Sequence, residues 1–179
     1  EEGRIYRIKE LYGCTGTPNE GLRIDPVEQA RRIREAEQND PMLRGRRITG
    51  VADPAIFNES QGESIAQMQE KHPYLLTWKP GDHTRIAGKM QLHYRLSFDE
   101  EGRPMFQVFD TCRHFIRTIP NLVYDESNVE DIDTTQEDHI YDECRYVLME
   151  NPISPKLVRK RQPMRDDPLD LDAGKSRTR

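Results

Sequence analysis

Hydrophobic and polar positions follow one another along the chain in short patterns, and each pattern predicts a strand or a helix. Alternating or short continuous apolar runs predict strands over 4–12, 47–53, 74–78 and 105–110. Apolar residues spaced three or four apart predict helices over 25–38, 60–72, 82–97, 111–119 and 134–150. Because strands and helices alternate along the chain, the pattern predicts an α/β fold.

The helical patterns also indicate which side chains pack inward. Ile65 and Met68 are expected to face inward in the helix over 60–72. The helix over 82–97 carries its apolar side chains at Ile86, Met90 and Leu96. The last helix has an apolar stripe that consists of Ile140, Cys144, Val147 and Leu148.

The length and composition suit one domain followed by a polar tail. The chain has 179 residues, of which 33% are charged and 34% hydrophobic, a lean supply for a core. The composition becomes more polar after Pro152, so we expect a domain over 1–153 and a disordered tail over 154–179. Glu1-Glu2-Gly3 is typical of a hairpin turn, which predicts a partner strand upstream of residue 1.

Charge, hydropathy and cysteine usage exclude several classes of protein. The net charge of −5 argues against a general basic coat for nucleic acid, although a local basic groove is compatible with it. No apolar run approaches the roughly 18 residues of a membrane-spanning helix. The 3 cysteines are odd in number and widely spaced, which favours a reducing compartment over a disulfide framework.

Acidic residues gather in the stretch TTQEDHIYDECRY, residues 134–146. On a helix, Asp138 and Asp142 share the side opposite the apolar stripe, with His139 adjacent. Two carboxylates this close repel each other, and a divalent cation such as Mg²⁺, which prefers oxygen ligands, would remove that cost. The alternative is a solvated acidic face. Glu137 and Glu143 are expected to be ordinary helix charges.

A second candidate acid, Asp53, lies at the carboxyl end of the strand over 47–53, just before Pro54. Sites form at that edge of open α/β sheets, although a turn or capping role is the alternative. Basic residues interleave with aromatic residues near Trp78 and near Phe115, which suits a phosphate backbone. Ordinary exposed helix faces are the alternative for both basic sets.

Four motifs occur in an order that resembles a known family. They are Gly50-Val-Ala-Asp53-Pro54-Ala, Trp78-Lys79 leading to Asp82-His-Thr-Arg85, Phe109-Asp-Thr-Cys112, and Glu137-Asp-His-Ile-Tyr-Asp142-Glu-Cys-Arg-Tyr146. This order resembles the carboxy-terminal nuclease domain of tailed-phage large terminase subunits, over about residues 3–153. The most specific part is His-x-x-Asp-x-x-Arg-Tyr on a helix. The resemblance implies a ribonuclease H-like fold, with a mixed central sheet flanked by helices.

The resemblance also implies a site that binds two divalent metals, Mg²⁺ or Mn²⁺. Asp53 matches the strand-end acid of the family, and Asp142 matches the acid on the late helix. His139 matches a residue often found beside that acid, while Asp138 stands where the family often has Asn and is therefore auxiliary. The first-strand acid is expected upstream of residue 1, together with the first strands. Lys79, Arg85 and Lys89 are the side chains expected to guide the DNA backbone.

The function implied is a metal-dependent DNA endonuclease that cuts concatemeric viral DNA by two-metal phosphodiester hydrolysis. The expected partners are double-stranded DNA, the portal protein, the small terminase subunit and an ATPase domain of the same polypeptide, with no membrane. The expected place is the host cytoplasm at the procapsid, or the bacterial cytoplasm for a prophage-encoded protein. The alternatives are a non-catalytic module that docks on DNA or the portal, and an unrelated structural α/β domain.

Overall fold

The computed structural model describes residues 4–17, 19–59, 62–98 and 102–154. The turn expected at Glu1–Gly3 and, apart from Ser154, the tail expected over 154–179 lie outside these residues. In chain order the elements are β1 (Ile5–Arg7), α1 (Pro26–Asn39), β2 (Gly50–Ala52), η1 (Pro54–Phe57), α2 (Ile65–Glu70), β3 (Trp78–Pro80), α3 (Arg85–Leu96), β4 (Phe106–Val108), α4 (Arg113–Thr118), η2 (Ile119–Asn121) and α5 (His139–Met149).

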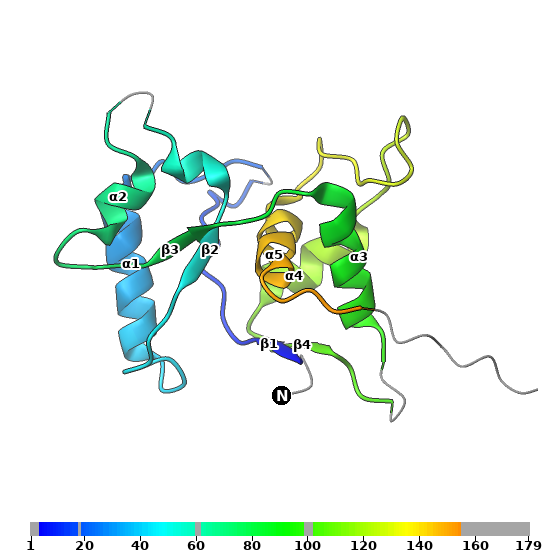
Figure 1. Ribbon diagram of the computed structural model, residues 1–179, viewed down its shortest axis with the longest axis horizontal. Coiled ribbons are helices and arrows are strands. Elements are labelled where there is room, and N and C mark those ends of the chain that lie inside the picture. Colours follow the sequence, from blue (N-terminus) through cyan, green and yellow to red (C-terminus); the bar gives the residue numbers. More distant parts are fainter. Residues whose placement is uncertain (1–3, 18, 60–61, 99–101, 155–179) are drawn as a thin grey trace, which may run out of the picture.

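The strands form two parallel pairs, which confirms the α/β class. β1 pairs with β4, and β2 pairs with β3 in a register that places Gly50 beside Trp78 and Ala52 beside Pro80. In the described ranges these pairs are two separate sheets of two strands each. Figure 1 shows β2 and β3 beside α1 and α2, while β1 and β4 lie below α5 and α4.

The strand predicted over 74–78 was placed too early, since β3 begins at Trp78. The carbonyl oxygens of Tyr74 and Leu75 each accept a hydrogen bond from the Arg34 guanidinium of α1, at 2.5 Å. Leu75 also has a φ of 52°, a left-handed conformation that a strand does not contain. The hydrogen bonds from Arg34, which lies 40 residues before Tyr74, therefore hold this segment in a turn, and the strand begins only at Trp78.

The inward faces predicted for α2 and α3 were largely wrong. Ile65 is 40% exposed, whereas Ala66 and Gln69 are buried against α1. On α3 the apolar side chains Ile86, Met90 and Leu96 are exposed. The residues of α3 that are buried instead are Gly88, Lys89, Gln91, Leu92 and Arg95. The reason is that α5 packs on this face, where a Cβ on Gly88 would lie 3.0 Å from the Cβ of Arg145.

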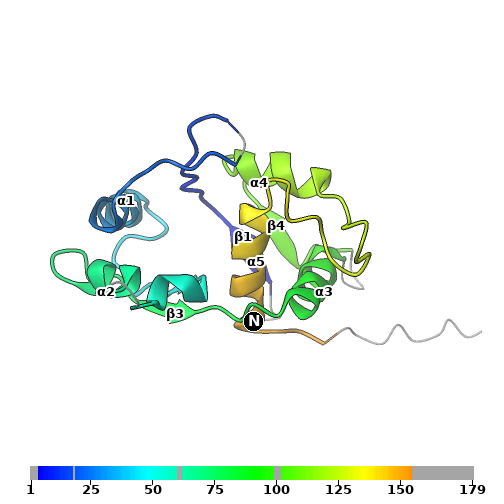
Figure 2. The same ribbon diagram turned by 90° about the horizontal axis from the view of Figure 1, so that it is seen from above.

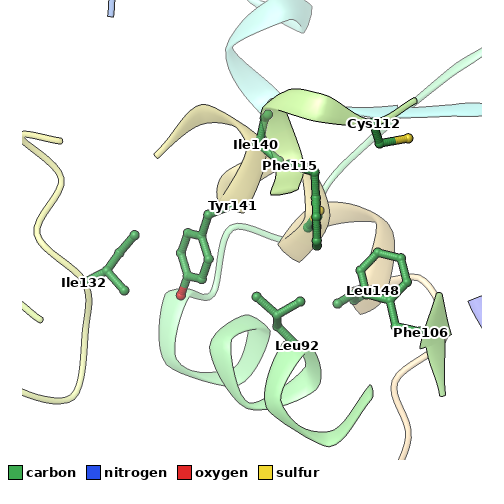
Figure 3. Close-up of a cluster of buried hydrophobic side chains, with 9 residues drawn as sticks. Leu92, Phe106, Cys112, Phe115, Ile132, Ile140, Tyr141 and Leu148 are labelled. Carbon is green, nitrogen blue, oxygen red and sulfur yellow. The ribbon is translucent and has the colours of Figure 1, made fainter. Parts of the chain in front are cut away.

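The main apolar core lies around α5, α4 and the inner face of α3 (Figure 3). Its buried members are Leu92, Phe106, Cys112, Phe115, Ile132, Ile140, Tyr141, Cys144 and Leu148. α5 also contacts β2, so it lies between this core and the part of the fold that contains α1 and α2 (Figures 1 and 2). In the part of the chain that the structure describes, no helix is long and apolar enough to span a membrane.

Candidate functional site

Asp53 links the end of β2 to α5. One carboxylate oxygen, Oδ1, accepts a hydrogen bond of 2.7 Å from the backbone N–H of Ala55 and so caps the short helix η1. The other, Oδ2, accepts a hydrogen bond of 2.7 Å from the hydroxyl of Tyr146. These two donors, Ala55 first, hold the pKa of Asp53 below its usual value, so the carboxylate is ionised at neutral pH. Asp53 therefore has the capping role and also reaches across to another element.

The helix α5 begins at His139, with Asp138 as its N-cap, and not at residue 134 as expected. Of the predicted apolar stripe, Ile140, Cys144 and Leu148 are buried, whereas Val147 is 41% exposed. The buried side of the helix also includes Tyr141, Arg145 and Tyr146. Burial of an arginine on this face requires a compensating acid.

Asp142 provides that compensation for Arg145, which is only 1% exposed. The Asp142 Oδ1 atom accepts hydrogen bonds from Arg145 Nε at 3.1 Å and from Nη2 at 2.6 Å. The Arg145 guanidinium also lies 5.4 Å from the ring centroid of Tyr141 and 5.3 Å from that of Tyr146. A second cation, Arg85, approaches the same carboxylate oxygen at 3.5 Å. The side chain of Asp142 remains 28% exposed, and the described hydrogen bonds from Arg145 go to its Oδ1 atom.

Asp138 is an acid in an unfavourable place. It is 7% exposed, and its side chain forms no capping hydrogen bond to α5. Burial raises the pKa of Asp138, and the charge of Asp142 raises it further. The Nδ1 atom of His139 lies 4.0 Å from Asp138 Oδ1, and the imidazole is 66% exposed. The pair of acids predicted by helical spacing therefore carries the repulsion that a bound divalent cation would remove.

Tyr146 lies between the two acidic centres. Burial raises the pKa of Tyr146 to about 12, together with the hydrogen bond to Asp53 and the negative charges of Asp53 and Asp142. Gly81, which follows β3, leaves room for Tyr146, because a Cβ on Gly81 would lie 2.7 Å from the Cβ of Tyr146. The phenol is thus protonated at neutral pH and donates to Asp53 while lying near Asp142.

The three cations expected to guide DNA already have partners. Lys79 Nζ lies 3.1 Å from Glu150 Oε2, and Arg85 forms two hydrogen bonds to Asp131, of 2.5 and 3.1 Å. Lys89 is 8% exposed, donates to the backbone carbonyl of Glu130 and lies over the ring of Tyr124. Of the three, Lys79 has the most accessible side chain, at 58% exposure. The structure therefore brings Lys89 into the protein rather than to the surface.

Two acids that the sequence marks as ordinary charges form specific ion pairs. Both oxygens of Glu137 accept hydrogen bonds of 2.7 Å from Arg117, and Tyr12 donates to Oε1 at 2.5 Å. Glu143 forms a two-point pair with Arg7 of β1, at 3.0 and 2.9 Å. The first pair fixes the segment just before α5 to α4, and the second fixes α5 to β1. Their partners lie far away in the chain, so helical spacing contained no signal for them.

The acids fit a divalent ion only in part. No group of three or more His, Cys, Asp or Glu residues within the described ranges is placed to hold a metal ion. Asp138 and Asp142 together match what Mg²⁺ takes when one or two carboxylates hold it and waters or a phosphate complete its shell. Asp53 is connected to this pair through Tyr146, which donates a hydrogen bond to Asp53 and lies near Asp142.

Comparisons with known proteins leave the family open. No protein-family model matches the chain, and no curated protein and no solved structure matches it. The function is therefore argued from the residues and their geometry.

Proposed function

We propose that the chain is a metal-dependent DNA endonuclease domain, of the ribonuclease H-like type found in the large terminase subunits of tailed phages. It cuts concatemeric viral DNA with Mg²⁺ or Mn²⁺ by phosphodiester hydrolysis, beside the portal protein, the small terminase subunit and an ATPase domain. The proposal rests on the order of the motifs and on one contact, the hydrogen bond from Tyr146 to Asp53. That contact brings the strand-end acid to the helix that carries Asp142.

The side chains around this contact have distinct tasks in the proposed site. Asp138 and Asp142 would hold a divalent ion, whose charge would offset the burial and the repulsion from Asp142 that raise the pKa of Asp138. A metal of this kind polarises a phosphate and activates a water molecule. Asp53 is ionised and is the strand-end ligand, held in orientation by Ala55 and Tyr146. His139, exposed at the start of α5, would position the attacking water or the phosphate.

The basic residues near the site mainly bind the acids. Arg145 donates two hydrogen bonds to Asp142, and Arg85 lies 3.5 Å from the same carboxylate oxygen. Asp131 in turn holds Arg85, so the guanidinium is oriented before any ligand arrives. This preorganised arrangement matches a site that must accept a phosphate beside several carboxylates.

Nicking of supercoiled plasmid DNA tests the proposal. A protein that carries this chain together with the first-strand acid that the resemblance implies is expected to nick in Mn²⁺ and to stop in EDTA. Asp53→Asn and Asp142→Asn are each expected to lower the nicking rate at least about a hundredfold, the scale of a lost catalytic contact. Unchanged rates in both variants would show that the site is misassigned.

A second candidate is a non-catalytic module that grips DNA or docks on the portal. The observation that favours it is the lack, in the ranges described, of three metal-binding side chains in one group. Such a module would bind duplex DNA in EDTA as tightly as in Mn²⁺, and no variant of Asp53 would change that affinity. An endonuclease site predicts tighter binding in a metal that does not support cutting, such as Ca²⁺.

A further inference from the structure

Within the described residues, the loop between α1 and β2 contains three arginines that form no described ion pair. We call residues 41–47 the arginine loop, since Arg44, Arg46 and Arg47 are all exposed in it. From Pro41 to Ala52 the chain contains no Asp or Glu. In Figure 1 the loop lies at the lower left, and β2 runs upward from it. The loop therefore presents three guanidinium groups with no carboxylate on the same segment.

Most other arginines on this side of the fold are neutralised. On α1, Arg31 pairs with Glu28 and Glu35, and Arg32 pairs with Glu28. By contrast, none of the described ion pairs involves an arginine of the arginine loop. The acid just before the loop, Asp40, is already bound to Lys9 at 2.9 Å. The loop is thus left as a positive patch on a protein whose net charge is −5.

The arginine loop is held in shape by its own hydrogen bonds. The backbone N–H groups of Leu43 and Arg44 donate to the carbonyl of Asp40, and Gly45 adopts a φ of 75°, which favours glycine. Arg44 Nε donates to the carbonyl of Gln38 at 2.8 Å, and Arg46 Nε donates to that of Met42 at 2.6 Å. These bonds use one nitrogen of each guanidinium, so the terminal Nη groups remain for a ligand with paired oxygens.

We infer that the arginine loop binds the phosphates of duplex DNA on one side of the Asp53 site, an inference that rests on the proposed endonuclease function. The guanidinium fork matches phosphate oxygens better than a point charge does. The chain runs six residues from Arg47 to Asp53, which spans at most about 20 Å. At 3.4 Å per base step, the loop contacts the backbone within roughly six base pairs of a phosphate at Asp53.

Continuity with β2 is the reason to choose DNA over other anionic partners. The strand that follows the loop ends at the proposed catalytic acid, so one duplex that reaches Asp53 passes within range of the loop. A membrane would need apolar side chains to insert beside the cations. From Met42 to Ala52 one large apolar side chain is exposed, Met42 at 49%, whereas Leu43, Ile48 and Val51 are partly buried. The loop therefore supplies contacts to the backbone, which position DNA without reading its sequence.

Fluorescence anisotropy with a labelled DNA duplex in EDTA tests the inference, because no metal and no cutting are needed. The test variant is Arg46→Gln with Arg47→Gln, and the matched control is Arg31→Gln with Arg32→Gln. Both remove two adjacent arginines and the same charge. We expect the test pair to weaken binding at least about tenfold and to lower the salt slope of log Kobs by about 2. The control pair is expected to change the slope by less than about 0.5.

Three outcomes would overturn the inference. They are an unchanged slope in the test pair, an equal loss in the control pair, and tighter binding to phosphatidylserine vesicles than to the duplex. Arg46→Lys with Arg47→Lys keeps the charge and is expected to keep the slope, while unfolding curves in urea confirm that all variants fold. Because binding is measured without metal, a failure to cut DNA leaves this result intact and counts only against the proposed function.

Discussion

The hydroxyl of Tyr146 donates a hydrogen bond of 2.7 Å to Asp53, across 93 residues of chain. It joins the strand-end acid of β2 to the helix that carries Asp142, and α5 contacts β2 in the same region. The same phenol experiences the charges of both acids. The candidate site therefore consists of two acidic centres that one protonated tyrosine holds beside each other.

Tyr146→Phe is expected to loosen this junction without changing its shape. The variant removes a donor from a carboxylate, so we expect the free energy of unfolding to fall by about 1–2 kcal/mol. The pKa of Asp53 is expected to rise toward its ordinary value, because one of its two donors is lost. Urea unfolding and an NMR titration of the carboxyl carbon measure the two effects. Tyr6→Phe is the control, since Tyr6 is 53% exposed. An unchanged Asp53 pKa in Tyr146→Phe would contradict the role of the contact.

Asp138→Asn is expected to stabilise the protein at neutral pH. The folded-state pKa of Asp138 is raised, so its ionised form opposes folding, and this cost disappears as pH falls through that pKa. We expect a gain of roughly 0.5–2 kcal/mol at pH 7, in the range of single stabilising changes. The gain should vanish below about pH 4, where both states bind the proton. Glu126→Gln, at an exposed position, is the control in the urea series. A loss of stability at pH 7 in Asp138→Asn would show that the ionised Asp138 carboxylate has favourable partners in the folded protein.

Glu137→Gln is expected to have the opposite pH dependence. Arg117 first, and then Tyr12, lower the pKa of Glu137 to about 2, so its stabilisation is full above the ordinary carboxyl pKa and is lost as pH falls toward 2. We expect the free energy of unfolding to fall by about 1–2 kcal/mol at pH 7, since the variant removes a partly buried charge that accepts hydrogen bonds from two residues. Glu35→Gln, from an exposed pair on α1, is expected to cost less than about 0.5 kcal/mol. Equal costs for the two variants would contradict the account.

Gly81→Ala tests whether the position of Tyr146 matters. Its Cβ would lie 2.7 Å from the Cβ of Tyr146, closer than packed atoms lie, so the ring or β3 must move. We expect a destabilisation of about 1–3 kcal/mol, as for overpacked cores. Gly13→Ala is the control, because nothing lies within 4 Å of the added methyl group. The outcome that counts against this view is equal stability of the two variants in thermal unfolding.

Local signals in the sequence predicted the elements well where the cause is local. The helix expected from Asp25 does begin at Pro26, since the Asp25 side chain caps it and the proline suits its first turn. The strand that ends at Asp53 was also found, although it is shorter than predicted. β3 was misplaced because Arg34, from another helix, bonds to the carbonyls just before it. No local pattern encodes that contact.

The candidate site, too, could be predicted only where its cause is local in the sequence. Helical spacing placed Asp138 and Asp142 together, but it did not reveal that Asp138 is buried. The inward face of α3 was missed because its buried Lys89 and Arg95 are polar residues that bond to distant carbonyl groups. The hydrogen bond between Asp53 and Tyr146 depends on how β2 meets α5. That arrangement follows from packing across the whole fold, beyond the reach of periodicity.

Binding of Mn²⁺, followed by the electron paramagnetic resonance of the free ion, tests the central claim most directly. The account predicts that the chain binds Mn²⁺ and that Asp53→Asn and Asp142→Asn each weaken the binding at least about tenfold, or 1.4 kcal/mol. Asp53→Asn keeps the size of the side chain, so urea unfolding should show a folded variant. Glu126→Gln should bind as the parent chain does. Affinities that are equal in the parent chain and both variants, or no binding at millimolar Mn²⁺, would contradict the metal site.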